Sequence, residues 1–361
     1  MLNFVPVDRL KAGMVLGRDI FGVNTFTSKL VLLRANQELT SNNIIQMKLK
    51  KVSGAYIKTK SIYDVESFIS KAVKENMLGN IKTIFDLSYN LCDKVSCELY
   101  IGAIKYANNI IGELVDNITS HPNLYVDLSS LRIYDDYTYN HSLGVTILSI
   151  AIGNALGLEK KDLVDLGLSA ILHDVGKTHI PLEIISKPSK LDDEEFEMIK
   201  KHVEIGGKLL LKNKLIMPKI YRGVMSHHEY YDGSGYPFGL KGKQIPAFGR
   251  IIACADVYDA LTASRPYRAP SPACDVIEYV MAGAGIQFDL DVVNAFLKCI
   301  SPYPIGACVV LCDGRIATIY EQNSGYPLRP KIVLFDSPYK VIDLKTDREY
   351  LNVTINGLYD N

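Results

Sequence analysis

The chain has 361 residues, of which 48% are hydrophobic and 22% charged, as expected for a folded globular protein with room for more than one domain. Its 40 basic and 40 acidic residues cancel, so the whole chain has no net electrostatic attraction for a long nucleic acid. Binding of a small anionic ligand by a few local charges remains possible. The longest mostly apolar run is too short to span a bilayer, and the first residues show no secretory signal. The seven cysteines include no CxxC pair, so we expect reduced thiols and a cytoplasmic location.

Residues 1–61 are predicted to form a small β-rich module. The apolar runs at 14–22 and 29–39 are typical of strands. Residues 40–52 predict a short helix capped by Thr40 or Ser41, and a closing strand follows it. Residues 62–122 have spaced apolar positions and few helix breakers, which predicts helices in a regulatory or linker region. A homodimer formed through this N-terminal region is one arrangement that such helices allow.

Residues 123–302 have helical periodicity almost throughout, and we expect them to form one all-helical domain. Asp192 with Glu195 three residues later predicts a capping box at the start of one of these helices. Residues 303–361 change to β-rich runs, the first two joined by a predicted hairpin at Asp313-Gly314. The expected fold class is therefore mainly α, with a small N-terminal α/β segment and a C-terminal β appendage.

Histidines supply the strongest functional signal in the helical domain. A single histidine with apolar neighbours is usually a hydrogen-bonded core residue, and His121 and His179 are expected at the surface or in a supporting role. Five others occur in the same domain as two carboxylates set in apolar segments, which makes a shared metal site the better interpretation. These residues are His141, His173, Asp174, His202, His227, His228 and Asp256.

Nitrogen and carboxylate donors of this kind suit iron, manganese or zinc and argue against calcium or magnesium. Seven donors exceed the needs of one catalytic ion, and the two oxygens of Asp174 can bridge a pair of ions. Two ions about 3.5–4 Å apart stabilise the attacking and leaving oxygens of a phosphoryl displacement and activate water. Lys177 follows about one turn later and could reach the same cavity, but a solvated lysine at a helix end is an equally good interpretation.

Several motifs in this order resemble one known family. "HDVGK" at 173–177, the histidine of "KKHVEIG" at 202 and the stretch 227–268 resemble the HD-GYP domain, a subgroup of the HD phosphohydrolase superfamily. Gly235-Tyr236-Pro237 is the GYP motif itself. The resemblance covers about half of the chain. It implies an all-helical HD-type bundle whose two- or three-metal centre, commonly iron or manganese, hydrolyses cyclic di-GMP to linear pGpG and often further to GMP.

The resemblance also implies roles for individual residues. One ion would be held by His141, His173, Asp174 and Asp256, and the other by Asp174, His202, His227 and His228. Lys177 would face the scissile phosphate, and the expected substrate contacts are Gly235, Tyr236, Pro237, Asp259, Arg265 and Arg268. Family members with a third metal can carry a glutamate four residues before the first histidine. Here that residue is Tyr137, so the resemblance favours two ions and leaves a third unsupported.

Two alternatives stay open at this point. One is a catalytically weak sensor that binds a cyclic dinucleotide and changes shape, which the complete donor set argues against because buried carboxylates without a metal are costly. The other is a phosphodiesterase for a different cyclic dinucleotide, such as cyclic GMP-AMP. We expect a metal-dependent cyclic di-GMP phosphodiesterase that uses metal-activated water.

Overall fold

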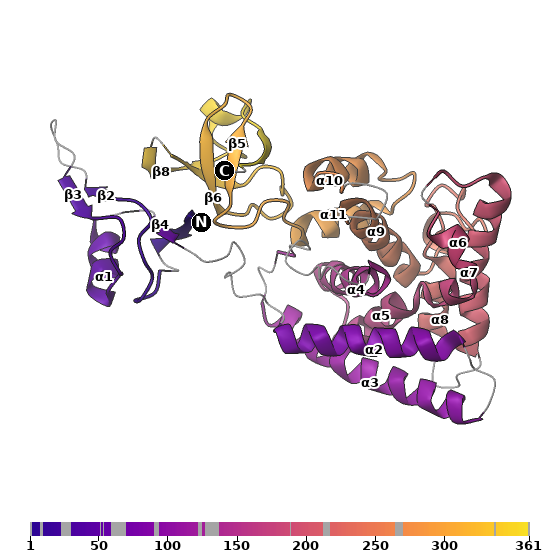
Figure 1. Cartoon of the computed structure of the whole chain (residues 1–361). Coiled ribbons are helices and arrows are strands. Elements are labelled where there is room, and N and C mark those ends of the chain that lie inside the picture. Colours follow the sequence, from indigo (N-terminus) through magenta and orange to yellow (C-terminus); the bar gives the residue numbers. More distant parts are fainter. Residues whose placement is uncertain are drawn as a thin grey trace. The chain divides into compact units, whose positions relative to one another are not determined.

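The fold was taken from a computed structural model of the chain (Figure 1). It divides into two compact units, one formed by residues 68–300 and the other by residues 1–67 together with 301–361. The structure describes residues 2–7, 10–22, 30–50, 52, 54–58, 70–89, 94–121, 125–126, 137–187, 189–211, 217–263, 270–335 and 337–359.

The unit of residues 68–300 is helical, as predicted. Its α-helices are α2 (Lys71–Tyr89), α3 (Lys94–Thr119), α4 (Tyr137–Ala155), α5 (Lys160–Leu172), α6 (Leu182–Ile185), α7 (Asp193–Leu211), α8 (Pro218–Ser226), α9 (Ala247–Thr262), α10 (Ala273–Ala282) and α11 (Leu290–Cys299). Short 3₁₀ helices occur at η3 (Val175–His179) and η4 (Gly242–Gln244). Figure 1 shows α2 and α3 side by side as an antiparallel pair.

Helix α4 forms the centre of this unit. Every residue from 141 to 153 is buried, because the helix is apolar around its whole circumference and packs against α5, α9 and α11. The predicted capping box at the start of α7 is confirmed. The Glu195 amide donates to Asp192 Oδ1 at 2.9 Å, and the Asp192 amide donates to Glu195 Oε2 at 2.9 Å. These helices bring distant parts of the sequence to one core.

The other unit is mainly β and includes segments from both sides of the helical unit. Residues 1–67 contribute β1 (Leu2–Pro6), β2 (Ile20–Gly22), β3 (Leu30–Leu33), α1 (Ser41–Leu49) and β4 (Gly54–Lys58). Residues 301–361 contribute β5 (Cys308–Leu311), β6 (Ile316–Glu321), β7 (Lys331–Leu334), β8 (Ser337–Asp343), η5 (Arg348–Tyr350) and β9 (Ile355–Leu358). Thr40 is the N-cap of α1, as one of the two predicted candidates. Strands β1 and β9 were not predicted.

Among the described residues, strands β1 and β4 pair antiparallel, as do β2 and β3, and the C-terminal strands form one antiparallel sheet in the order β8-β7-β6-β5-β9. The predicted hairpin at Asp313-Gly314 joins β5 and β6, which pair with Cys308 opposite Thr318. The fold class predicted from the sequence, mainly helical with small terminal α/β and β segments, is confirmed.

Tyr56 joins the N-terminal and C-terminal parts of this β-rich unit. Its hydroxyl lies 3.0 Å from Thr318 Oγ1, and its ring centroid lies 4.9 Å from that of Phe335. The Arg18 guanidinium lies over both rings, 5.0 Å from the Tyr56 centroid and 4.3 Å from the Phe335 centroid. The predicted domain limits at 61, 122 and 302 stay predictions. Within the described residues, the terminal segments that we treated as separate modules pack as one unit.

No helix among the described residues combines the length and the hydropathy needed to cross a bilayer.

Candidate metal centre

The candidate donors lie on helices that meet at one place in the helical unit. His141 lies on α4, His202 in the middle of α7 and Asp256 on α9. The remaining donors directly follow helix ends: His173 and Asp174 come after α5, and His227 and His228 come after α8. Helix packing therefore brings together side chains that are far apart in the sequence.

These seven residues form two groups of potential metal donors. The first donor group consists of His141, His173 and Asp256, and the second consists of Asp174, His202, His227 and His228. Within each group, the ligand atoms all lie within 4.8 Å of one another. Donors that bind one ion at about 2.1 Å lie at most about 4.2 Å apart, so small side-chain movements would close either group around a cation.

Asp174 lies between the two groups and faces both. Its Oδ2 lies 3.3 Å from His173 Nε2 and 3.7 Å from His141 Nε2, both in the first group. Its Oδ1 lies 3.4 Å from His202 Nε2 and 4.0 Å from His227 Nε2, both in the second group. One carboxylate thus offers a different oxygen to each group, which is the geometry of a bridging ligand.

Backbone hydrogen bonds fix the orientation of three of the imidazoles. His173 Nδ1 donates to the Ala170 carbonyl at 2.7 Å, and His202 Nδ1 donates to the Ile199 carbonyl at 2.6 Å. His227 Nδ1 donates to the carbonyl of residue 224 at 2.6 Å. Each bond places the proton on Nδ1 and leaves the Nε2 lone pair directed toward the other donors, as a metal-binding histidine requires.

Burial keeps the histidines of the second group neutral. It lowers the pKa of His202 to about 4 and that of His228 to about 3, and it lowers the pKa of His227 well below its usual value. For His228 and His227, neighbouring histidines add to this effect, because another positive charge nearby would be unfavourable. Neutral imidazoles are the form that binds metal ions.

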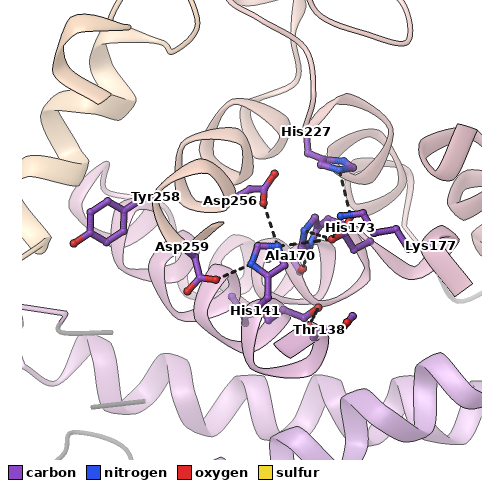
Figure 2. Close-up of polar contacts among 12 residues, drawn as sticks. Thr138, His141, Ala170, His173, Lys177, His227, Asp256, Tyr258 and Asp259 are labelled. Carbon is purple, nitrogen blue, oxygen red and sulfur yellow. Dashed lines mark hydrogen bonds and ion pairs between the residues drawn. The ribbon is translucent and has the colours of Figure 1, made fainter. Parts of the chain in front are cut away.

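His141 has a different environment, with a carboxylate at each ring nitrogen. Figure 2 shows it between Asp256, whose Oδ1 lies 3.1 Å from Nε2, and Asp259, whose Oδ2 accepts a 2.6 Å hydrogen bond from Nδ1. Burial alone would lower the pKa of His141, but the hydrogen bonds with these carboxylates outweigh it and raise the pKa to about 10. The ring therefore carries a proton on each nitrogen, and a metal ion bound at Nε2 would displace the proton that faces Asp256. The pKa of Asp256 is lowered, because the contact with His141 overcomes the effect of burial.

Asp259 is buried beside His141, and the substrate contact predicted for it stays a prediction. We predicted a nucleotide contact, but Asp259 is only 3% exposed and its carboxylate is directed at His141. A carboxylate that accepts the Nδ1 proton of a metal-binding histidine orients the ring and raises its basicity. Its burial argues for support of His141 rather than direct contact with a ligand.

Gly176 allows α7 to approach Asp174 closely. A side chain at this position would collide with the His202 carbonyl and the Gly206 amide. Lys177, the next residue, extends its ammonium to 2.6 Å from Asp174 Oδ2 while its side chain stays 30% exposed. The "HDVGK" motif thus places a donor, a close helix contact and a cation within one turn.

Another feature of the site was missed by the sequence analysis, which gave no role to Glu229. This carboxylate is 1% exposed and accepts hydrogen bonds from the amides of Phe238 at 2.7 Å and Leu240 at 2.9 Å. It thereby holds the loop that carries the GYP motif. Its position directly after the paired histidines, in front of a glycine-rich loop, was the only signal available in the sequence.

The GYP loop itself borders the second donor group. The ring of Tyr236, an expected substrate contact, stacks on the His228 imidazole with centroids 4.7 Å apart. The neighbouring Gly235 and Pro237 are partly buried in the same loop. The predicted substrate contacts Arg265 and Arg268 lie outside the described residues.

Two other histidines are not part of either group. His121 is exposed and its Nδ1 donates to the Asn117 carbonyl at 2.7 Å. His179 is exposed too, and its ring lies 5.7 Å from that of Tyr89. Both positions agree with the surface or supporting role expected for them.

The buried cluster fits a divalent metal centre. His173 Nε2 and Asp174 Oδ1 are buried without a hydrogen-bond partner, although a lone buried polar atom is costly. Both atoms face other donors, so a cation would satisfy them. The nitrogen and carboxylate set matches transition metals better than calcium or magnesium.

Comparison with known proteins assigns residues 115–292 of the helical unit to a family. The family model described as "HD domain" matches residues 115–292. The chain is 37% identical over 254 residues to a curated cyclic di-GMP phosphodiesterase of Pseudomonas aeruginosa, a match that covers 67% of this chain and 61% of that protein. It is 39% identical over 173 residues to a cyclic di-GMP phosphodiesterase of Thermotoga maritima, which covers 47% of each.

A third relative differs in its substrate. A 3'3'-cGAMP-specific phosphodiesterase of Vibrio cholerae is 33% identical over 216 residues, covering 59% of this chain and 41% of that protein. The chain thus spans less than two thirds of each of these relatives. Among solved structures, an HDG"Y"P protein from Bdellovibrio bacteriovorus matches with a TM-score of 0.51 at 19% identity, covering 82% of this chain and 98% of that one. This likeness supports the fold.

Proposed function

Because residues 115–292 are an HD domain of the HD-GYP kind, we propose that the chain is a metal-dependent phosphodiesterase that opens cyclic di-GMP to linear pGpG. The observation that carries this proposal is the position of Asp174. Its two oxygens face different donor groups, with Oδ2 3.3 Å from His173 Nε2 and Oδ1 3.4 Å from His202 Nε2. A carboxylate shared in this way is suited to a pair of ions.

The proposed centre holds two ions, with iron or manganese best matched to its imidazole and carboxylate donors. One ion would be held by the first donor group with Asp174 Oδ2, and the other by the second donor group with Asp174 Oδ1. When bound, such a pair activates water and stabilises the charge on the phosphodiester oxygens. A third ion stays possible but unsupported, because Tyr137 stands where family members with a third metal can carry a glutamate.

The chain's own residues supply the rest of the proposed chemistry. Lys177 holds a positive charge beside Asp174 on a partly exposed side chain, where it could offset negative charge on the scissile phosphate. Asp259 holds the Nδ1 proton of His141 and so keeps its Nε2 directed at the first group. Arg265 and Arg268 stay predicted contacts to phosphate or guanine, since an arginine fork can bind either.

The test is an assay of purified chain with cyclic di-GMP and added Mn²⁺ or Fe²⁺. Products are separated by chromatography, and the metal content is measured on the same sample. We expect pGpG to appear only when metal is present, and a later peak of GMP would reveal a second cut. Binding of cyclic di-GMP without any product would instead identify a sensor.

A second candidate substrate is cyclic GMP-AMP. The Vibrio cholerae relative named for 3'3'-cGAMP favours considering it, since it is 33% identical to this chain. Competition between the two cyclic dinucleotides in one reaction distinguishes the candidates, because the preferred substrate is the one with the larger kcat/KM. Faster loss of cyclic GMP-AMP would replace cyclic di-GMP in the proposal.

The cellular location and the oligomeric state of the chain are part of the proposal. A cytoplasmic location agrees with the free thiols of the six cysteines that the structure describes. A homodimer formed through the N-terminal region stays a prediction.

A further inference from the structure

We propose that the GYP loop is a support for the second donor group, and that the Glu229 carboxylate holds this loop against His228. The inference rests on the proposed metal centre and deepens it, because it assigns a positioning residue to one ion and not the other. In the described contacts, the Glu229 carboxylate binds the amides of Phe238 and Leu240 in the loop, so we expect its effect on the donors to pass through the loop.

The carboxylate of Glu229 is a two-point clamp. Oε1 accepts from the Phe238 amide at 2.7 Å and Oε2 from the Leu240 amide at 2.9 Å. Glu229 itself is 1% exposed, so these two bonds are the main compensation for burying a carboxylate. Moving a buried carboxylate away from its hydrogen-bond donors costs free energy, so these two bonds restrict the motion of the loop.

Backbone contacts continue from this clamp to His228. The Tyr236 amide donates to the His228 carbonyl at 3.1 Å, and the Gly233 amide donates to the Tyr230 carbonyl at 2.8 Å. Gly235 passes so close to residues 228–230 that a Cβ there would collide with the Tyr230 amide and the His228 carbonyl. The loop therefore folds back directly on the segment that carries the paired histidines.

The last link is the Tyr236 ring. It stacks on the His228 imidazole with centroids 4.7 Å apart and 28° between the planes, and the Lys200 ammonium lies 5.5 Å from the centroid of the tyrosine ring. The other imidazoles of the second group have a different support, since His202 and His227 donate Nδ1 protons to backbone carbonyls. For His228 the support that we identify is this stacked ring, which depends on the position of the loop.

The proposal predicts that loosening the clamp weakens one ion selectively. Glu229→Gln keeps the size of the side chain but turns an acceptor into an amide donor, which then faces a backbone N–H. Loss of supporting contacts of this kind typically costs about 10–100-fold in metal affinity. We expect that loss for the second ion, with the first ion retained.

The experiment titrates Mn²⁺ into metal-free wild-type protein and variants, with bound metal counted after equilibrium dialysis and coupled ion pairs detected by electron paramagnetic resonance. Asp232→Asn is the matched control, because it changes an acid to an amide in the same loop at a carboxylate that binds only Ser234 in the described contacts. We expect Glu229→Gln to show an isolated ion where wild type and Asp232→Asn show a coupled pair. Equal binding of both ions by Glu229→Gln would overturn the proposal.

A second pair of variants covers the case in which Glu229→Gln does not fold. Tyr236→Leu removes the stacked ring and should lose the second ion, whereas Tyr236→Phe keeps the ring and should retain it. Retention of both ions by Tyr236→Leu would contradict the proposed support. The readout is metal binding and does not depend on catalysis. If the variants lose the second ion as expected but the wild-type protein does not cleave cyclic di-GMP, the proposed function is refuted and this inference stands.

Discussion

The two donor groups are held in place by different forces. In the first, His141 lies between the carboxylates of Asp256 and Asp259, which raise its pKa to about 10 against the effect of burial. In the second, burial lowers the pKa of His202 to about 4, and its Nδ1 proton goes to a backbone carbonyl. Carboxylates therefore control His141 in the first group, whereas backbone carbonyls orient the neutral rings of His202 and His227 in the second. Substitutions around the centre should therefore affect the two groups separately, except where a residue serves both.

Asp174 is the residue that serves both groups, so its substitution should have the largest effect. Asp174→Asn removes the charge and one of the two oxygens that face the groups. We expect metal content to fall at both positions and turnover to fall by at least about 10³-fold, or about 4 kcal/mol of transition-state stabilisation. Elemental analysis and a product assay on the same preparation measure both. A variant that kept both ions would break the idea of a shared carboxylate.

Lys177→Met should lower the rate of catalysis without lowering the metal content, because it removes a charge expected to act on the scissile phosphate. The ammonium is paired with Asp174 but lies on a partly exposed side chain. Its loss should lower kcat by about 10²-fold, as expected for a group that stabilises charge or transfers a proton in the transition state. Metal content should stay near that of wild type.

The matched control for this prediction is Lys201→Met, because Lys201 is an exposed lysine on α7. If both lysine variants turn over substrate like wild type, Lys177 is an ordinary surface lysine.

Asp259→Asn tests the first group alone. The amide can no longer accept the Nδ1 proton of His141 with a full negative charge, so the ring loses its orientation. We expect the affinity of the first ion to fall by about 10–100-fold while the second ion is retained, which is the mirror image of the effect expected for the GYP loop. Mn²⁺ titration with resonance detection measures it.

Asp275→Asn, at an exposed position on α10, is the control for Asp259→Asn. An unchanged first ion accompanied by a raised KM in Asp259→Asn would return Asp259 to the substrate-contact role predicted from the sequence.

Tyr56→Phe should have the smallest effect of these substitutions, and it should leave metal binding by both donor groups unchanged. The substitution removes the buried contact with Thr318 Oγ1 in the β-rich unit. We expect the free energy of unfolding of that unit to fall by about 1 kcal/mol, with unchanged metal content. Denaturant unfolding followed by circular dichroism measures the change, and Tyr326→Phe at a half-exposed ring is the control. Loss of metal in Tyr56→Phe would show that the two units depend on each other.

Local patterns in the sequence were sufficient for much of the fold. Apolar periodicity found the helical unit, and short-range side-chain chemistry found the caps at Thr40 and Asp192, because such contacts depend on residues three apart. Strand β1 was missed since five residues give too weak an alternation. The contact between Tyr56 and Thr318 could not be predicted, because local sequence patterns carry no information about two residues that are 262 positions apart.

The donor residues of the candidate centre could be predicted from the sequence, but the residues that hold these donors in position were harder to predict. The five histidines and two carboxylates converge in the structure, and their two groups match the ligand sets implied by the family resemblance, with Asp174 assigned to the second group. Whether they hold metal stays a prediction. Glu229 was missed because its role depends on burial and direction, since it is turned toward two backbone amides. The substrate contact predicted for Asp259 stays a prediction, and its hydrogen bond with His141 could not be seen in the sequence.

The construction of the β-rich unit from residues 1–67 and 301–361 has a consequence for biosynthesis. A ribosome makes the segment that contains Tyr56 before it makes Thr318 and Phe335, so the Tyr56 ring must wait for these partners. The core around Leu39 and Ile57 needs only residues of the early segment. During that interval, the Tyr56 ring lacks the partners that leave it only 7% exposed in the folded unit. The packing of Tyr56 should therefore be a later event in folding than the formation of the core within residues 1–67.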